Sequence, residues 1–208
     1  MRPTAGSRSE TSQGSIRREY KALTRQRLVD AAVAEFEARG YAACTIEDIA
    51  RRAGTSRATF YVHFDGKVEL IEGLWEATRT GLVSLYRELV RSDVRNRDFL
   101  ESWLSKTFDF YRGNRQRLIA VHEAIALESD LAEVYYERTN ELAGFVSPLL
   151  RRRSDETDEQ VRCRAALLTV QHERFCFLWL LRGLPYDGGV VVPTLARQWH
   201  DELGTNTS

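Results

Sequence analysis

The 208-residue sequence has few cysteines, scattered histidines and no net charge, and each shortage excludes a class of protein. Its three cysteines, Cys44, Cys163 and Cys176, cannot form a paired disulfide framework, so we interpret them as free thiols in a reducing cytosol. The four histidines form neither an H-E-x-x-H motif nor a Cys/His ligand pair, and the G-x-S-x-G motif and glycine-rich phosphate loops are missing. We therefore expect no catalytic residues, no metal and no cofactor, which argues against an enzyme.

The chain also lacks a long apolar run. The nearest candidate, residues 175–181, is far shorter than the roughly 20 residues of a membrane span, and residues 1–21 are polar, unlike a signal peptide. We expect a cytoplasmic protein without a membrane partner. Strand patterns are equally scarce, since the three valines at 190–192 have no partner strand, and helical spacing prevails elsewhere. The sequence predicts an all-α fold of about nine helices.

The zero net charge conceals an asymmetry between the two ends of the chain. Residues 1–67 carry twelve Lys/Arg and eight Asp/Glu, and the remainder carries eighteen and twenty-two, so a basic end precedes an acidic body. We predict a disordered basic N-terminal arm over residues 1–20, a DNA-binding domain over 21–67, and a helical dimerisation and effector-binding domain over 68–208.

Residues 45–70 have the spacing of a helix, a tight turn and a second short helix. Thr45, with Asp48 three residues later, predicts a capping box, and Gly54 supplies the backbone freedom that a helix end needs. Ser56 can cap the second helix, whose outward-facing side chains are then Arg57, Thr59, Tyr61 and His63. Two short helices joined around a glycine indicate a helix-turn-helix.

This stretch closely resembles the DNA-binding segment of the TetR family of transcriptional regulators. The matching residues keep an unbroken register: Thr45, Ile49, Ala50, Ala53, Gly54, Ser56, Thr59, Tyr61, His63, Phe64, Lys67 and Leu70. The resemblance implies that Thr45, Tyr61, His63 and Lys67 contact DNA phosphates. It assigns groove reading to Arg57, Ala58 and Thr59, and Ser56 completes the predicted DNA-binding site. Ala58 stands where the family most often has glycine.

Further helices are expected over residues 22–39, 65–91, 98–112, 115–127, 130–152, 159–182 and 190–203. Pro148 should kink or reset the end of its helix, and Pro193 should fall in the first turn of the last one. Residues 165–181 are apolar nearly all round the helix, which indicates burial on more than one side. A twin subunit can supply the second surface, so we predict a homodimer through the last two helices.

The segment L-L-T-V-Q-H-E-R-F-C-F, a Gly-Leu-Pro loop and a final R-Q-W-H-D-E-L-G resemble the C-terminal half of the EthR-like branch of the TetR family. The resemblance implies that the last two helices form the dimer bundle beside an aromatic-lined ligand tunnel. On this basis we predict a ligand site formed by Trp103, Phe110, Thr169, His172, Phe177 and Trp199. Spacing alone favours a packed core for the aromatic residues, and a core histidine is the alternative for His172.

The resulting prediction is a regulator that binds a near-palindromic double-stranded DNA operator and releases it when a small hydrophobic effector binds. Two alternatives stay open: an activator, and a ligand-independent DNA-binding protein of the same fold.

Overall fold

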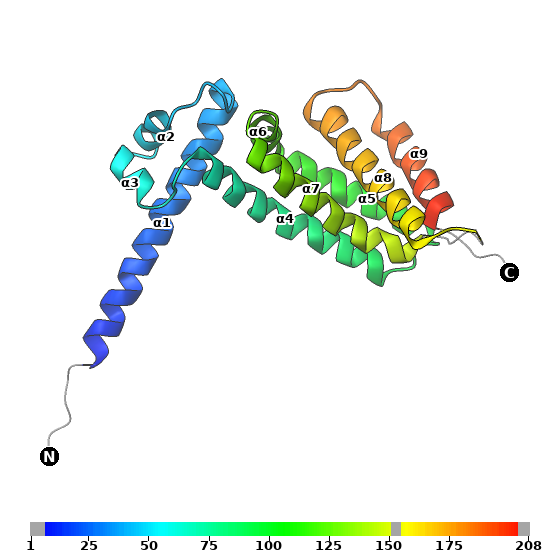
Figure 1. Cartoon of the computed structure of the whole chain (residues 1–208), viewed down its shortest axis with the longest axis horizontal. Coiled ribbons are helices and arrows are strands. Elements are labelled where there is room, and N and C mark those ends of the chain that lie inside the picture. Colours follow the sequence, from blue (N-terminus) through cyan, green and yellow to red (C-terminus); the bar gives the residue numbers. More distant parts are fainter. Residues whose placement is uncertain (1–6, 151–154, 204–208) are drawn as a thin grey trace, which may run out of the picture. The chain divides into compact units, whose positions relative to one another are not determined.

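The computed structural model describes the backbone of residues 7–150 and 155–203, and within these ranges the side chains from Ser15 onward. It divides into two compact units, Met1–Glu72 and Gly73–Ser208. The α-helices are α1 (Ser7–Arg39), α2 (Ile46–Arg52), α3 (Arg57–Tyr61), α4 (Lys67–Arg91), α5 (Arg97–Gly113), α6 (Arg115–Ile125), α7 (Ser129–Val146), α8 (Asp158–Cys176) and α9 (Gly188–Leu203) (Figure 1). The described residues contain no strand, which confirms the all-α prediction.

The first helix differs from its prediction. It begins at Ser7 rather than near residue 22, so residues 7–20, which we expected to be disordered, are helical, and residues 1–6 lie outside the described part. Once a helix is nucleated, each further residue adds one hydrogen bond, and no proline interrupts this segment. The C-terminal part of α1 packs on the core, since Leu28 and Phe36 are buried, whereas Tyr20 nearer its N-terminus is 66% exposed.

The first unit has a small core between α1, α2 and α3. Ile49 of α2 and Phe60 of α3 are fully buried, as is Leu28 of α1. Gly54 adopts a left-handed φ of 66° after α2, and the amide of Thr55 bonds to the carbonyl of Ala50. This turn allows the chain to reverse within a few residues, so the predicted helix-turn-helix is present.

The core of the second unit lies among α4, α5, α8 and α9. α5 packs along α9, and α7 packs along α8. Trp103 and Trp199 are among the largest fully buried side chains, and the Trp103 indole donates to the carbonyl of Leu85 at 2.8 Å. α4 and α5 approach closely where Gly81 faces the ring of Phe110, since a Cβ on Gly81 would overlap that ring.

The last three helices differ from prediction at their ends. α7 ends at Val146, short of the predicted end at 152, and a 3₁₀ turn that contains Pro148, Ser147–Leu149, follows. The predicted helix over 159–182 is α-helical only to Cys176 and continues as a π-helical turn, Phe177–Leu181.

α9 begins two residues before its predicted start. The backbone carbonyl of Asp187 accepts the amide of Val191, and its side chain accepts the amide of Gly189, which together form the helix start. Pro193 therefore lies in the second turn of α9 instead of the first. Because proline has no N–H, the carbonyl four residues earlier, that of Gly189, has no helical donor, and Gly189 is exposed. None of the helices in the described ranges is long and apolar enough to span a membrane.

Candidate functional site

The recognition helix α3 presents its N-terminal end to solvent. Ser56 caps it by accepting the amide of Thr59 at 3.1 Å. Arg57 and Ala58 are exposed, whereas Phe60 is fully buried and packs on the ring of Phe64. Of the four side chains predicted to face outward, Arg57 and Tyr61 are exposed, whereas Thr59 and His63 are half-buried.

Arg57 is held by its neighbours on the surface of the first unit. Its guanidinium forms an ion pair with Glu47, and a second nitrogen lies 3.3 Å from the Tyr61 hydroxyl. The hydrogen bond with Tyr61 and the charge of Glu47 raise the pKa of Arg57. Both partners of the ion pair are at least half exposed, so the pair contributes little stability and a DNA phosphate can compete for Arg57.

Thr45 and Thr59 use their hydroxyls within the protein. Thr45 forms the predicted capping box with Asp48: the amide of Asp48 donates to the Thr45 hydroxyl at 3.1 Å, and the amide of Thr45 donates to the carboxylate at 3.2 Å. The Thr45 hydroxyl also donates to this carboxylate at 2.6 Å, and the hydrogen bonds from the Thr45 hydroxyl and amide lower the pKa of Asp48 to about 2. Thr59 is half-buried, with its hydroxyl oxygen 2.9 Å from that of Ser56.

Lys67 has a structural role that its sequence position did not indicate. Its ammonium donates to the carbonyls of Tyr41 at 2.9 Å and Cys44 at 2.8 Å, and lies 4.3 Å from the centre of the Tyr41 ring. Two of its three N–H donors are therefore used to fasten the start of α4 to the loop before α2, and one is left for a phosphate.

His63 lies beside basic residues of α1. It is half-buried, and its Nδ1 has no hydrogen-bond partner among the described residues. Burial, together with the charges of Lys21 and Arg25, lowers the pKa of His63. Neutral His63 can donate one hydrogen bond. Arg25 of α1, which no sequence motif indicated, lies with its guanidinium carbon 4.6 Å from the centre of the Phe64 ring and adds a positive charge beside His63.

The predicted ligand residues do not surround a common cavity. Trp103, His172 and Trp199 meet, but they form a closed packing cluster with ring centres 5.0–5.8 Å apart. Thr169 donates to the carbonyl of Ala165 instead of facing a ligand. This outcome corrects the predicted position of the pocket near Trp199, because these side chains fill the space themselves.

The other two predicted ligand residues lie elsewhere in the second unit. Phe177 is buried and packs on His122, with ring centres 4.1 Å apart. Phe110 is half-buried and faces Gly81.

A small cavity does exist in the second unit, among α4, α5, α6, α7 and α8. Its volume is about 50 Å³. None of the six predicted residues lines it. The lining residues are Trp75, Thr78, Arg79, Leu82, Tyr111, Leu118, Val121, His122, Tyr135, Arg138, Thr139, Leu142 and Glu173.

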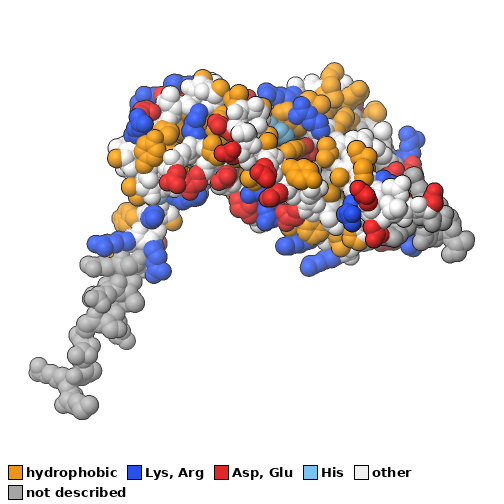
Figure 2. All heavy atoms as spheres, in the orientation of Figure 1, with side chains coloured by type: hydrophobic (Ala, Val, Ile, Leu, Met, Phe, Trp, Pro, Cys, Tyr) orange, Lys and Arg blue, Asp and Glu red, His pale blue; other side chains and the backbone are white. Residues whose placement is uncertain are grey.

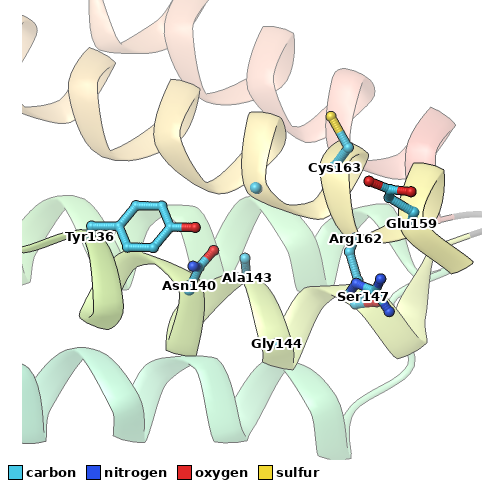
Figure 3. Close-up of a pocket in the computed structure, with 9 residues that line it drawn as sticks. Tyr136, Asn140, Ala143, Gly144, Ser147, Glu159, Arg162 and Cys163 are labelled. Carbon is cyan, nitrogen blue, oxygen red and sulfur yellow. The ribbon is translucent and has the colours of Figure 1, made fainter.

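A larger cleft of about 450 Å³ lies at the surface between α7 and α8 (Figure 3). Tyr136, Asn140 and Gly144 line it from α7, and Arg162 and Cys163 line it from α8. A Cβ on Gly144 would meet no atom within 4 Å, so the floor of the cleft is open. Its charged residues, Glu159 and Arg162, are already exposed to solvent, so the cleft contains no buried charge that requires a ligand.

α8 and α9 carry an exposed apolar surface. Leu167 and Val170 of α8 are 64% and 44% exposed, and Val190 of α9 is 61% exposed. Figure 2 shows hydrophobic side chains gathered over the ends of α8 and α9 that their connecting loop joins. Phe177 and Leu181, in contrast, are buried within the chain itself. The apolar circumference of α8 thus faces its own core on one side and solvent on the other.

Together, a helix-turn-helix unit with an exposed recognition helix and an all-helical second unit define a DNA-binding transcriptional regulator. The family model of bacterial regulatory proteins of the tetR family matches residues 28–74. The chain is 30% identical to the HTH-type transcriptional activator FasR of Mycolicibacterium smegmatis over 165 residues, which cover 78% of this chain and 75% of FasR. The chain belongs to the TetR family.

Two further comparisons agree. The chain is 31% identical to the HTH-type transcriptional repressor KstR2 of Rhodococcus jostii over 129 residues, 62% of this chain but only 59% of KstR2. A TetR-family transcriptional regulator from Syntrophomonas wolfei has a similar fold, with a TM-score of 0.68 at 15% identity over 89% of this chain and 99% of that one. The proteins named here are regulators and not enzymes.

Proposed function

We propose that the protein binds a near-palindromic operator as a homodimer and releases it when a small effector binds. The observation that supports operator binding is the exposed N-terminal end of α3, with Arg57 and Ala58 free of the core. A recognition helix enters the major groove with this end. Thr59 and Arg57 then read base edges, while Tyr61, His63 and the remaining N–H of Lys67 position the helix on phosphates.

Selection of bound fragments from genomic DNA tests operator binding, followed by affinity measurements at several salt concentrations. Thr59→Ala should change the preferred sequence, since a groove-reading side chain is shortened. Tyr61→Phe should weaken binding to all fragments alike, because it removes a phosphate contact. If the wild-type protein prefers no fragment at any salt concentration, operator binding is wrong.

We propose that the exposed apolar surface of α8 and α9 forms the dimer contact. The exposed side chains of this surface are Leu167, Val170 and Val190. An exposed apolar patch on a protein surface commonly indicates a protein–protein interface. The resemblance of the C-terminal half to the EthR-like branch supports the same two helices. Two recognition helices would then contact half-sites about 34–36 Å apart. Light scattering at micromolar concentration measures the oligomeric state, and a stable monomer would contradict the proposal.

The direction of regulation follows from the family default of repression, with activation as the second candidate. One relative, KstR2, is named a repressor and another, FasR, an activator. An effector that favours a state unsuited to the operator lowers operator affinity, and the operator lowers effector affinity by the same factor. A reporter gene under the selected operator, with and without the regulator, separates the two directions.

A further inference from the structure

Glu173 lines the small cavity of the second unit, and both oxygens of its carboxylate have hydrogen-bond donors. The Glu173 carboxylate accepts the Tyr135 hydroxyl at 2.6 Å and the His122 ring nitrogen at 3.0 Å, one on each oxygen. Burial raises the pKa of Glu173, but the hydrogen bonds from His122 and Tyr135 outweigh it and hold the pKa below its usual value. Glu173 is therefore charged, and it already has donors on both oxygens.

Arg138, in the same cavity, is only partly satisfied. One guanidinium nitrogen lies 3.3 Å from a Glu76 carboxylate oxygen, and the group stacks 5.1 Å from the centre of the Trp75 ring. The same Glu76 oxygen also lies 3.2 Å from Arg79. The other terminal nitrogen of Arg138, Nη1, is buried and has no hydrogen-bond partner within the described residues. An unpaired buried N–H of a charged group is costly, and a ligand acceptor would remove that cost.

The remaining walls of the cavity favour an apolar ligand body. They include Trp75, Leu82, Leu118, Val121 and Leu142. A cationic head group is disfavoured, because the guanidinium groups of two lining arginines would repel it while the only lining carboxylate already has its donors.

We infer that this cavity takes a small molecule with an apolar body and a carboxylate head, and that the carboxylate binds Arg138 in competition with Glu76. The inference deepens the proposed effector response and rests on it. It gives the small hydrophobic effector predicted from sequence an anionic head group, because the unpaired polar atom here is a cationic donor.

The closed state of the cavity suggests how such a ligand would act. A volume of about 50 Å³ holds little more than water, whereas small-molecule sites span roughly 300–1,000 Å³. The ligand must therefore select a state in which α4 and α7 separate. Two ion pairs join these helices, Glu76–Arg138 and Arg79–Glu141. A ligand carboxylate on Arg138 replaces one of them, and so has different affinities for the two states.

The test uses the purified full chain and two matched probe series: octanoate, octanamide and octylamine, and phenylpropionate with its amide and amine. Thermal shift and calorimetric titration without DNA measure binding. At least one carboxylate should bind the wild type, and its amide and amine should bind at least about tenfold more weakly, since a charged hydrogen bond is lost. Failure of both carboxylates to bind, or equal binding of an amide or amine, overturns the inference.

Two substitutions should act in opposite directions. Arg138→Met should weaken carboxylate binding about 10–100-fold, and Glu76→Gln should strengthen it severalfold because the competing carboxylate is gone. Arg112→Met is the matched control, since Arg112 also stacks on a tryptophan, Trp179, and pairs with an acid outside the cavity. If Arg138→Met does not fold, Arg138→Lys, which keeps the charge but loses the second N–H, should still weaken binding about threefold or more. Unchanged affinity in the folded Arg138 variant refutes the inference.

Operator release, measured separately by fluorescence anisotropy, distinguishes the two proposals. If a carboxylate binds through Arg138 while the operator stays bound, the effector response fails and the ligand class stands. If only the amine or amide releases the operator, the response stands and the inferred ligand class is wrong.

Discussion

The wild-type protein should become less stable as the pH falls, and replacing His172 by leucine should abolish most of this decrease in the free energy of unfolding. The imidazole is enclosed by Trp103, Phe108 and Trp199. The Thr107 hydroxyl donates to a backbone carbonyl at 2.7 Å, so its oxygen accepts the His172 Nε2 proton at 3.3 Å. Nδ1 then carries the lone pair and has no partner among the described residues. A proton added there would create an enclosed charge, and burial accordingly lowers the pKa of His172 from 6.5 to about 4.

The sign of the effect follows from which state binds the proton. Between about pH 6.5 and pH 4 the unfolded chain protonates His172 and the folded chain does not, so stability falls as the pH falls through this window. One pKa unit corresponds to about 1.4 kcal/mol, so the complete loss is about 3 kcal/mol. From about pH 7.5 to pH 5 the expected share of that loss is about 2 kcal/mol.

Urea unfolding monitored by tryptophan fluorescence measures this change in the free energy of unfolding for the second structural unit, which contains His172. All four tryptophans, at positions 75, 103, 179 and 199, belong to the second unit. His172→Leu should be nearly as stable as the wild type at neutral pH and should lose about 2 kcal/mol less on acidification. Protein concentration must stay fixed, because dimerisation would add to the apparent stability.

Phe108→Leu is the matched control, since it loosens the same cluster without removing a titratable group. It should be less stable at every pH, by about 1 kcal/mol or more, and should keep the wild-type pH dependence. If His172→Leu and the wild type lose the same free energy on acidification, the enclosed neutral imidazole is not the source of the effect.

Three further predictions concern packing and assembly. Lys67→Met should lower the stability of the first unit by about 1–3 kcal/mol, seen by circular dichroism, because the carbonyls in the loop 41–44 lose their donor; an unchanged melting temperature would leave Lys67 with a phosphate role alone. Leu167→Glu should give a folded monomer in light scattering, and a dimer of wild-type strength would remove α8 from the interface. Gly81→Ala should lower the free energy of unfolding by about 1–3 kcal/mol, seen as a lower urea midpoint, because the new methyl group overpacks against Phe110. A gain in stability would mean that the Phe110 ring can move aside.

The DNA-binding unit of the protein was predictable because its signals are local. The Thr45–Asp48 capping box, the left-handed Gly54 and the Ser56 cap each involve residues within a few positions of one another. Such contacts need particular residue types at short, fixed spacings, so they are visible in the sequence. The bonds of Lys67 to carbonyls more than twenty residues earlier were not visible, because no local pattern encodes them.

The position of the cavity could not be predicted for the same reason. Helical spacing identified Trp103 and Trp199 as core-facing, and both are buried. Whether two inward-facing aromatic residues enclose a space or fill it depends on side chains from several helices. Here His172 and Phe108 occupy that space, while the cavity opens where Glu173 holds His122 and Tyr135 in place. These residues lie too far apart in sequence to be recognised as a group.

The energies of the contacts between α4 and α7 limit how an effector could control DNA binding. Coupling free energies are typically about 1–3 kcal/mol, whereas one exposed ion pair contributes about 0–1 kcal/mol. Releasing Glu76 from Arg138 therefore cannot account for the coupling alone. The Trp75 ring packs on Tyr135 with ring centres 5.4 Å apart, and this apolar contact also has to change when the two helices separate. Trp75 and Lys67 belong to the same helix, α4, and Lys67 is bonded within the first unit.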